Sequence, residues 1–228
     1  MMYRSELKFI ITKYQMQLLK SNLECIMERD INSSVDGSYF IRSLYFDDYK
    51  DTAYNQVING LSEREKYRIR YYNYDSNFIR FENKYKKNNM NKKTSVNINK
   101  EDVVKIIDNQ EISTNDNLLS LFLIKKNTEL YRPVVIIDYN RDAYIYKAGN
   151  VRITFDYNLT CSYDIDNFFK KDIDSIPLLD KNEVILEVKF DEFLPSFIRQ
   201  ILNIDSIERT SFSKYANGRT MIKKVRGV

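Results

Sequence analysis

The 228-residue sequence predicts an α+β fold: a closed antiparallel β-barrel of about eight strands with a charged lumen, and helices packed outside it. Two observations predict this fold. Basic and acidic residues alternate with apolar ones in five strand-like segments, and segments with apolar residues at helical spacing are interspersed among the strands. Because successive side chains of a strand point to opposite faces, each segment has one apolar face and one ionic face.

The alternating segments share one phase of charge. In one of them Arg68 and Arg70 flank Ile69, and in another Glu187 and Lys189 flank Val188. A single segment of this kind is typical of an antiparallel sheet with one solvated face. Recurrence of Arg and Lys at the same phase favours a cationic lumen with a few carboxylates, which suits a linear polyanion. The five segments cover residues 4–9, 66–71, 81–85, 151–156 and 186–190.

The remaining strands and their connections follow from length and turn signals. A turn at 73–77 joins two of the strands as a hairpin, and the polar run at 86–93 is a loop or a strand extension. Arg132-Pro133 introduces a strand that is apolar enough to be buried, and an irregular link separates the last two strands. The expected strands are 3–11, 39–47, 64–73, 77–86, 94–98, 134–147, 151–159 and 183–191.

Helix starts are marked by capping residues. Thr12 is an N-cap for a helix that carries Leu19 and Leu23 at helical spacing, and Asn99 with Asp102 resembles a helix-start box. Ser213 is placed to cap the last helix. The other expected helices are 48–59, 116–127, 194–202 and 213–225. With no internal repeat, the sequence predicts a single domain over residues 1–228.

Composition limits the chemistry. The chain has 36 basic and 32 acidic residues, a net charge of +4, which is too small for a non-specific DNA-binding protein. It has no histidine, which excludes Ser-His-Asp and Cys-His nucleophile systems and histidine-ligated zinc. Any reaction therefore depends on Lys, Arg, Asp, Glu, Tyr or a metal held by oxygen.

Cysteine, aromatic and apolar residues indicate the environment. Cys25 and Cys161 form no metal or redox spacing and are predicted to be free thiols in a reducing compartment. No long apolar span is present, so we expect a cytoplasmic protein. Tyr67, Tyr71 and Phe81 lie opposite in phase to the cations, which predicts core packing and argues against a nucleic-acid partner.

Eight motifs, in order, carry a resemblance to a known family. The sequence resembles the VTC domain, the polyphosphate polymerase module of the vacuolar transporter chaperone complex, within the triphosphate tunnel metalloenzyme superfamily. The motifs are RSELKF (4–9), SLYFDD (43–48), KYRIRYY (66–72), FENKY (81–85), RPVVIIDYNRDAY (132–144), VRITFDYNL (151–159), VILEVKF (184–190) and FSKYANG (212–218).

The resemblance implies a set of site residues. The catalytic ones are Lys214, Arg68, Arg70 and Glu187. Phosphate is bound by Lys8, Arg68, Arg70, Lys84, Lys93, Arg141, Arg152, Ser213 and Lys214. Glu187, with Glu6 as a looser match, holds Mn²⁺ or Mg²⁺. A basic residue is frequent in the family just before FSK, where this chain has Ser211.

Each of these roles has a structural alternative. Glu187 could form an ion pair with a neighbouring Arg or Lys instead of holding a metal, and Lys214 could be a solvated surface residue. Asp156 is either a further metal ligand or, as we favour, the partner of a neighbouring cation.

The resemblance implies an enzyme, an ATP–polyphosphate phosphotransferase that moves the γ-phosphate of ATP to a growing polyphosphate chain. Two alternatives use the same residues: an inorganic or nucleoside triphosphatase, and a non-catalytic module that binds polyphosphate or inositol phosphates. The expected ligands are ATP or triphosphate and polyphosphate, and a membrane-associated protein is a possible partner.

Overall fold

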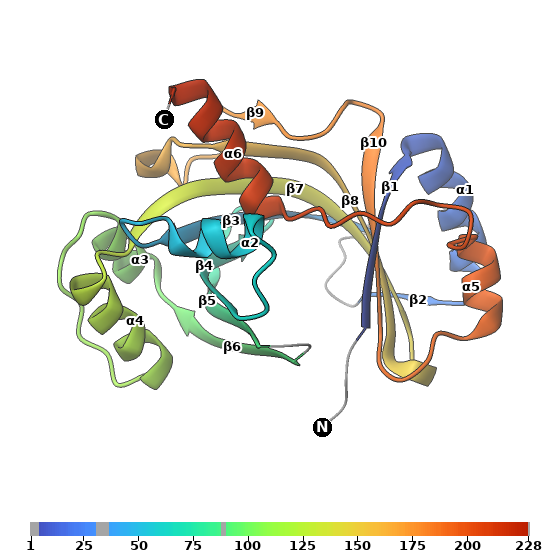
Figure 1. Ribbon diagram of the computed structural model, residues 1–228, viewed down its shortest axis with the longest axis horizontal. Helices are drawn as coiled ribbons and strands as arrows, with labels where there is room; N and C mark the ends of the chain where they lie inside the picture. Colours follow the sequence, from blue (N-terminus) through green and yellow to red (C-terminus); the bar gives the residue numbers. More distant parts are fainter. Residues whose placement is uncertain (1–4, 31–36, 88–89, 228) are drawn as a thin grey trace. The chain divides into compact units, whose positions relative to one another are not determined.

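The computed structural model describes residues 5–30, 37–87 and 90–227 (Figure 1). Residues 3–4, at the start of the first expected strand, and residues 88–89 of the polar run lie outside the described residues. The chain forms two compact units. Unit 1 comprises residues 1–40, 139–159 and 179–212, and unit 2 comprises residues 41–138, 160–178 and 213–228.

The fold class is α+β, as predicted, with ten antiparallel strands and six helices among the described residues. The strand order is β1-β10-β8-β7-β3-β4-β5-β6, with β2 paired to β7 and β9 paired to β8. This order is open, so closure into a barrel stays a prediction. The strands are β1 (Ser5–Thr12), β2 (Glu28–Arg29), β3 (Ser38–Asp47), β4 (Arg64–Tyr72), β5 (Asp75–Lys87), β6 (Met90–Ile98), β7 (Arg132–Tyr146), β8 (Val151–Ser162), β9 (Ile176–Pro177) and β10 (Glu183–Phe190).

The helices for which the sequence predicts a capping residue begin directly after that residue. Thr12 forms a full capping box with Gln15, and Asn99 accepts a hydrogen bond from the Asp102 backbone. None of the helices in the described ranges is long and apolar enough to cross a membrane. The helices are α1 (Lys13–Glu24), α2 (Thr52–Ile58), α3 (Lys100–Ile107), α4 (Asn117–Thr128), α5 (Ser196–Leu202) and α6 (Lys214–Arg226), with short 3₁₀ turns at Ala148–Asn150 and Ile165–Asn167.

Unit 1 has its core on the apolar face of β1, β10 and β8, against α1 and α5. Phe9, Ile153 and Val188 come from the three strands, and Leu23 and Leu202 from the two helices. All five are fully buried. The alternation in the sequence therefore gives this face its apolar half, and the charged half lies on the opposite side of the same strands.

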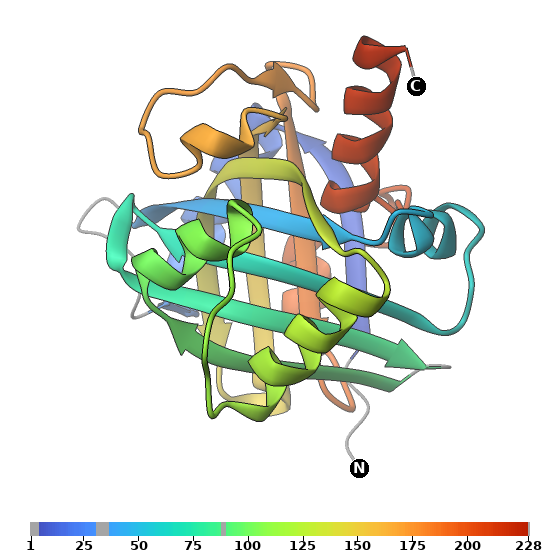
Figure 2. The same ribbon diagram turned by 90° about the vertical axis from the view of Figure 1, so that its left-hand side faces the viewer.

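Unit 2 buries the apolar face of β3 to β6 under α3 and α4, which cover the strands in Figure 2. Tyr67, Tyr71 and Phe81 belong to this core, as predicted. β4 and β5 form the expected hairpin, and its turn residues Asn73 and Tyr74 have φ values of 50° and 58°. Positive φ at both positions matches the turn type that follows the right-handed twist of paired strands.

Arg42 departs from the alternation, because it lies on the apolar side of β3 and is fully buried. Its Nη2 donates to Asp138 Oδ2 at 2.7 Å, and its Nη1 donates to the carbonyls of Phe168, at 3.0 Å, and Lys170. Burial opposes its charge, but the hydrogen bond and charge of Asp138 raise the pKa of Arg42 overall. Arg42 thus ties the irregular link after β8 to the sheet.

Two expected boundaries change. The helix expected at 48–59 begins at Thr52, because Asp48 Oδ1 accepts the backbone N–H groups of Lys50 and Thr52, both at 2.9 Å, and Asp51 is left-handed with φ 55°. These bonds make a turn instead of a helix start. The described part of the polar run is strand extension, since β5 continues to Lys87 and β6 starts at Met90.

Both cysteines are free thiols, and Cys25 is exposed whereas Cys161 is buried.

Candidate functional site

The charged side of unit 1 is formed by β1, β10 and β8, and we call it the first charged face. In the strand register Lys8 lies opposite Glu187, and Glu6 opposite Lys189. On the other side of β10, Glu187 lies opposite Thr154. Residues directly opposite each other in antiparallel strands share a face. The face comprises Glu6, Lys8, Arg152, Thr154, Asp156, Glu187 and Lys189, joined by Arg141 of β7 and Asp30 through ion pairs.

Two lysines hold the two glutamates together. Lys8 Nζ is 2.9 Å from Glu6 Oε1, and Lys189 forms an ion pair with Glu187 and lies 3.8 Å from Glu6 Oε2. Burial disfavours charge on both lysines. The carboxylates of Glu187 and Glu6 outweigh burial at Lys8 and raise its pKa, whereas burial prevails at Lys189 and lowers its pKa. The ion pair considered as an alternative for Glu187 is therefore present, with Lys189 as its partner.

The two arginines of this face also have carboxylate partners. Arg141 donates to both oxygens of Asp156, at 2.6 and 2.7 Å, a bidentate arrangement. Arg152 Nη2 is 2.6 Å from Asp30 Oδ2 and donates to Tyr39 Oη at 3.1 Å. Asp156, despite the opposing effect of burial, holds the pKa of Arg141 well above its ordinary value. Asp156 is thus the partner of a cation, the interpretation that the sequence favoured.

The residues around Glu187 fit a hard divalent cation. Glu6 and Glu187 are carboxylates on adjacent strands that share Lys189 as an ion-pair partner, and Mg²⁺ prefers oxygen ligands, one or two carboxylates together with substrate phosphates. Thr154 Oγ1, on the strand position opposite Glu187, is buried and has no hydrogen-bond partner within the described part of the chain. No cluster of three or more acidic or cysteine side chains suited to a metal occurs among those residues.

The charged side of unit 2 lies on β4, β5 and β6, and we call it the second charged face. Three rows of directly opposed residues define it: Lys66, Lys84 and Lys93; Arg68, Glu82 and Ser95; Arg70, Arg80 and Asn97. These nine positions hold six cations and one carboxylate. The first charged face instead balances four cations with four carboxylates. Positive charge is therefore concentrated in unit 2.

Glu82 is the carboxylate at the centre of the second charged face. Its side chain is 2% exposed, Arg68 Nε donates to Oε2 at 2.6 Å, and Lys93 Nζ lies 2.5 Å from Oε1. Burial alone would raise the pKa of Glu82, but Arg68, Arg70 and Lys93 hold it well below its usual range. The carboxylate is thus ionised and partly neutralises the six cations among these nine positions.

Tyr45 of β3 borders the same face. Arg68 Nη1 donates to Tyr45 Oη at 3.1 Å, and the Tyr45 ring lies 5.1 Å from the ring of Tyr215 in α6. Burial would raise the pKa of Tyr45, but Arg68, Arg70 and Lys66 lower it to about 7. A phenol that ionises near neutral pH is a sign of how strongly positive this face is.

Helix α6 brings the FSKY motif to unit 2. Ser213 caps the helix by accepting the N–H of Ala216 at 3.4 Å, as predicted, and Lys214 is its half-buried first residue. Lys66 Nζ lies 5.9 Å from the ring of the next residue, Tyr215. Lys214 therefore starts the helix one residue before a side chain that contacts the second charged face.

The expected site residues fall into two groups. Their phosphate and metal roles stay predictions, but their neighbours are defined. Unit 1 contains Glu6, Lys8, Arg141, Arg152 and Glu187, and unit 2 contains Arg68, Arg70, Lys84, Lys93, Ser213 and Lys214.

Residues of these faces that were not among the expected site residues include Tyr45, Lys66, Arg80 and Lys189. For the three cations the signal was present, since each has the same phase as a charged residue of its strand. The sequence contains no such signal for Tyr45, because the residues that alternate with it on the same side of the strand, Ser43 and Asp47, are not cations.

Comparison with solved structures finds proteins that share the fold of this chain. The putative adenylate cyclase of Bacillus halodurans is 14% identical, covers 93% of this chain and 96% of its own, and has a TM-score of 0.55. The PH1819 protein of Pyrococcus horikoshii OT3 is 14% identical, covers 97% of this chain and 99% of its own, and has a TM-score of 0.50. These likenesses show a shared fold.

The family is shown by a separate comparison. The model of the VTC domain matches residues 3–223, nearly the whole sequence, and the chain belongs to the VTC domain family. A search of curated proteins finds no match.

Proposed function

We propose that the chain is a polyphosphate polymerase that transfers the γ-phosphate of ATP to a growing polyphosphate chain. The observation that carries the proposal is the second charged face, where six cations accompany one carboxylate in a member of the VTC domain family. Guanidinium and ammonium groups hold phosphate oxygens, and a triphosphate brings several negative charges that need partners together.

In this proposal the chain's own cations position the reacting phosphates. Arg68, Arg70 and Lys84 bind the phosphates along β4 and β5, Lys93 extends the contacts onto β6, and Lys214 acts at the start of α6. Phosphoryl transfer needs little covalent participation from protein, because alignment and neutralisation of developing charge supply most of the rate. A sequence without histidine is compatible with this chemistry.

The first charged face supplies the metal site of the proposal. Glu187 and Glu6 would hold Mn²⁺ or Mg²⁺, and the bound ion would add positive charge that neutralises phosphate oxygens. Lys8, Arg141 and Arg152 would contact phosphates beside it. Lys189, now paired with Glu187, would have to release that carboxylate when the cation binds. The buried and unpartnered Thr154 Oγ1 supports a ligand or water at this position.

Incubation of the purified protein with ATP and Mn²⁺ tests the proposal, with products separated by gel electrophoresis and ion-exchange chromatography. A polymerase yields long-chain polyphosphate and ADP. Inorganic phosphate without polymer would identify a triphosphatase, and neither product, with tight binding of tripolyphosphate, would identify a binding module. Lys214→Ala and Glu187→Gln proteins serve as controls, because a contaminating activity would persist in both.

The proposal also covers the location, ligands and partner of the protein. Residues 1–228 act as one domain in the cytoplasm, the ligands are ATP or triphosphate and polyphosphate, and nucleic acid is not a partner. The proposed partner is a membrane-associated protein. Affinity purification from the source cells, with membrane and soluble fractions separated, tests the location and the partner.

A further inference from the structure

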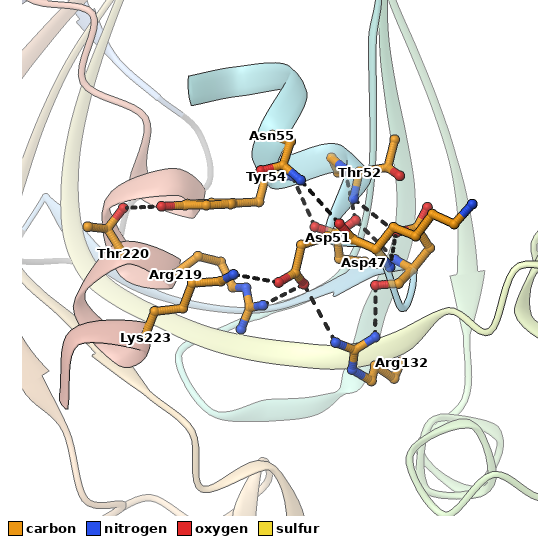
Figure 3. Close-up of polar contacts among 12 residues, drawn as sticks. Asp47, Asp51, Thr52, Tyr54, Asn55, Arg132, Arg219, Thr220 and Lys223 are labelled. Carbon is orange, nitrogen blue, oxygen red and sulfur yellow. Dashed lines mark hydrogen bonds and ion pairs between the residues drawn. The ribbon is translucent and has the colours of Figure 1, made fainter. Parts of the chain in front are cut away.

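Helix α6 presents a polar stripe to one segment of unit 2. Tyr215, Arg219 and Lys223 are spaced by four residues, so they lie on one side of the helix. Tyr215 binds Asp47, the last residue of β3. Arg219 and Lys223 bind Asp51, which lies between β3 and α2 (Figure 3). The stripe therefore fixes the rotation of α6 about its axis through polar contacts at three successive turns.

Asp47 anchors the beginning of the stripe. The fully buried carboxylate accepts the backbone N–H groups of Ala53, at 2.8 Å, and Tyr54, at 3.0 Å, and the hydroxyl of Tyr215. Asp47 follows Tyr45 by two residues in β3. One short stretch of chain thus touches the second charged face through Tyr45 and holds the start of α6 through Asp47.

Asp51 anchors the rest of the stripe. Arg219 Nη2 lies 2.6 Å from Oδ1, Lys223 Nζ 2.7 Å from Oδ2, and Arg132 Nη2 3.6 Å from Oδ1. The side chain is 14% exposed. Burial disfavours its charge, but Lys223 and Arg219 keep the pKa of Asp51 below its ordinary value. Tyr54 adds a hydroxyl contact to Thr220 at 3.1 Å.

We infer that Asp51 is a positioning residue for Lys214: by holding Arg219 and Lys223 it sets the rotation of α6, and with it the direction in which Lys214 meets bound phosphate. The inference rests on the proposed phosphate role of Lys214. Rotation matters because neighbouring residues of a helix project about 100° apart. A released stripe lets α6 turn, and the ammonium group of its first residue then leaves the phosphate.

Asn is the informative substitution at Asp51. The residue has φ 55°, a left-handed conformation that Asn tolerates well and Ala does not. Asp51→Asn therefore removes the charge and keeps the backbone. Tyr215→Phe is a second variant, because it loses the bond to Asp47 and keeps the ring that packs on Tyr45. The matched control is Asp205→Asn in unit 1, which breaks an exposed pair with Arg199.

A double-mutant cycle on tripolyphosphate affinity, measured by calorimetry without metal, tests the inference. Lys214→Ala is expected to weaken binding about tenfold, the loss of one charge-assisted contact. Asp51→Asn is expected to weaken it about fivefold alone and less than twofold in the Lys214→Ala background, because its effect passes through Lys214. Tyr215→Phe should behave in the same way, and Asp205→Asn should leave the affinity unchanged.

The outcomes separate this inference from the proposed function. Equal weakening by Asp51→Asn with and without Lys214 would overturn the inference, since the substitution would then act only through the fold. The non-additive cycle in a protein that makes no polymer supports the positioning role and rejects the polymerase. Wild-type protein that binds no tripolyphosphate would overturn both.

Discussion

Neutralising Glu82 should make the protein less stable and better at binding polyphosphate. Glu82→Gln keeps the shape of the side chain and one oxygen acceptor, but it removes the carboxylate that lies among six cations. In the free protein, Arg68 and Lys93 lose the negative charge of their carboxylate partner. In the complex, phosphate oxygens can replace it.

The magnitude follows from the burial of the pair. Removing one partner of a buried ion pair costs about 3–5 kcal/mol. Because Gln still accepts a hydrogen bond and the Lys93 side chain is 50% exposed, we expect a smaller loss, about 2–3 kcal/mol. For a chain of this size that lowers the melting temperature by about 4–12 °C. Removing one negative charge about 8 Å from a phosphate gains about 0.5–2 kcal/mol, roughly two- to thirtyfold in affinity.

The assay is thermal melting and calorimetric titration with tripolyphosphate at low ionic strength, where screening is weakest. Glu65→Gln is the matched control. Glu65 precedes Lys66 in β4 but points to the other face, where it accepts from Lys125 at 2.6 Å and Asn83 at 2.7 Å. It should lose stability without a change in affinity. Weaker or equal tripolyphosphate binding by Glu82→Gln would refute the reasoning, since Glu82 would then organise the site instead of opposing the ligand.

Three further outcomes follow. Arg42→Met leaves Asp138 buried without its cation and should lower the free energy of unfolding, measured in urea, by about 3–5 kcal/mol. The control Arg199→Met, which removes an exposed ion pair, should lower it by less than about 1 kcal/mol. Glu187→Gln should abolish metal-dependent turnover and preserve metal-free tripolyphosphate binding; loss of that binding would make the residue structural. The pKa of Tyr45 is about 10 in the unfolded chain and about 7 in the folded protein, so this residue should increase the free energy of unfolding as pH rises from about 7 to about 10. Absorbance near 295 nm should show one tyrosinate forming near pH 7, and the Tyr45→Phe protein should lack it.

The sequence predicts the elements well where the cause is local. Thr12, Asn99 and Ser213 cap helices because the hydroxyl or amide oxygen bonds the backbone a few residues ahead, a range that a sequence window contains. The same is true of the alternation in β4 and β5, whose apolar phase became the unit 2 core. Local rules fail at α2, where the side chain of Asp48 and the left-handed backbone of Asp51 delay the helix.

The burial of Arg42 could not be predicted from sequence. Its phase belongs to the apolar face of β3, where a guanidinium is costly, and the pattern offers no partner nearby. Asp138 and the carbonyls of 168–171 that satisfy it are about a hundred residues away in the chain. Only the fold brings them within hydrogen-bonding distance.

The charge balance of each face has the same origin. Lys8 and Lys84 occupy equivalent positions in alternating strands, and the sequence gives no reason to treat them differently. The strand register distinguishes them, because Lys8 lies opposite Glu187, whereas Lys84 lies between Lys66 and Lys93. Six neighbouring cations around one carboxylate leave a net positive charge that raises the free energy of the empty site, and a polyanion relieves that repulsion. The electrostatic gain on binding tripolyphosphate should therefore come mainly from unit 2, where the charge is not already neutralised.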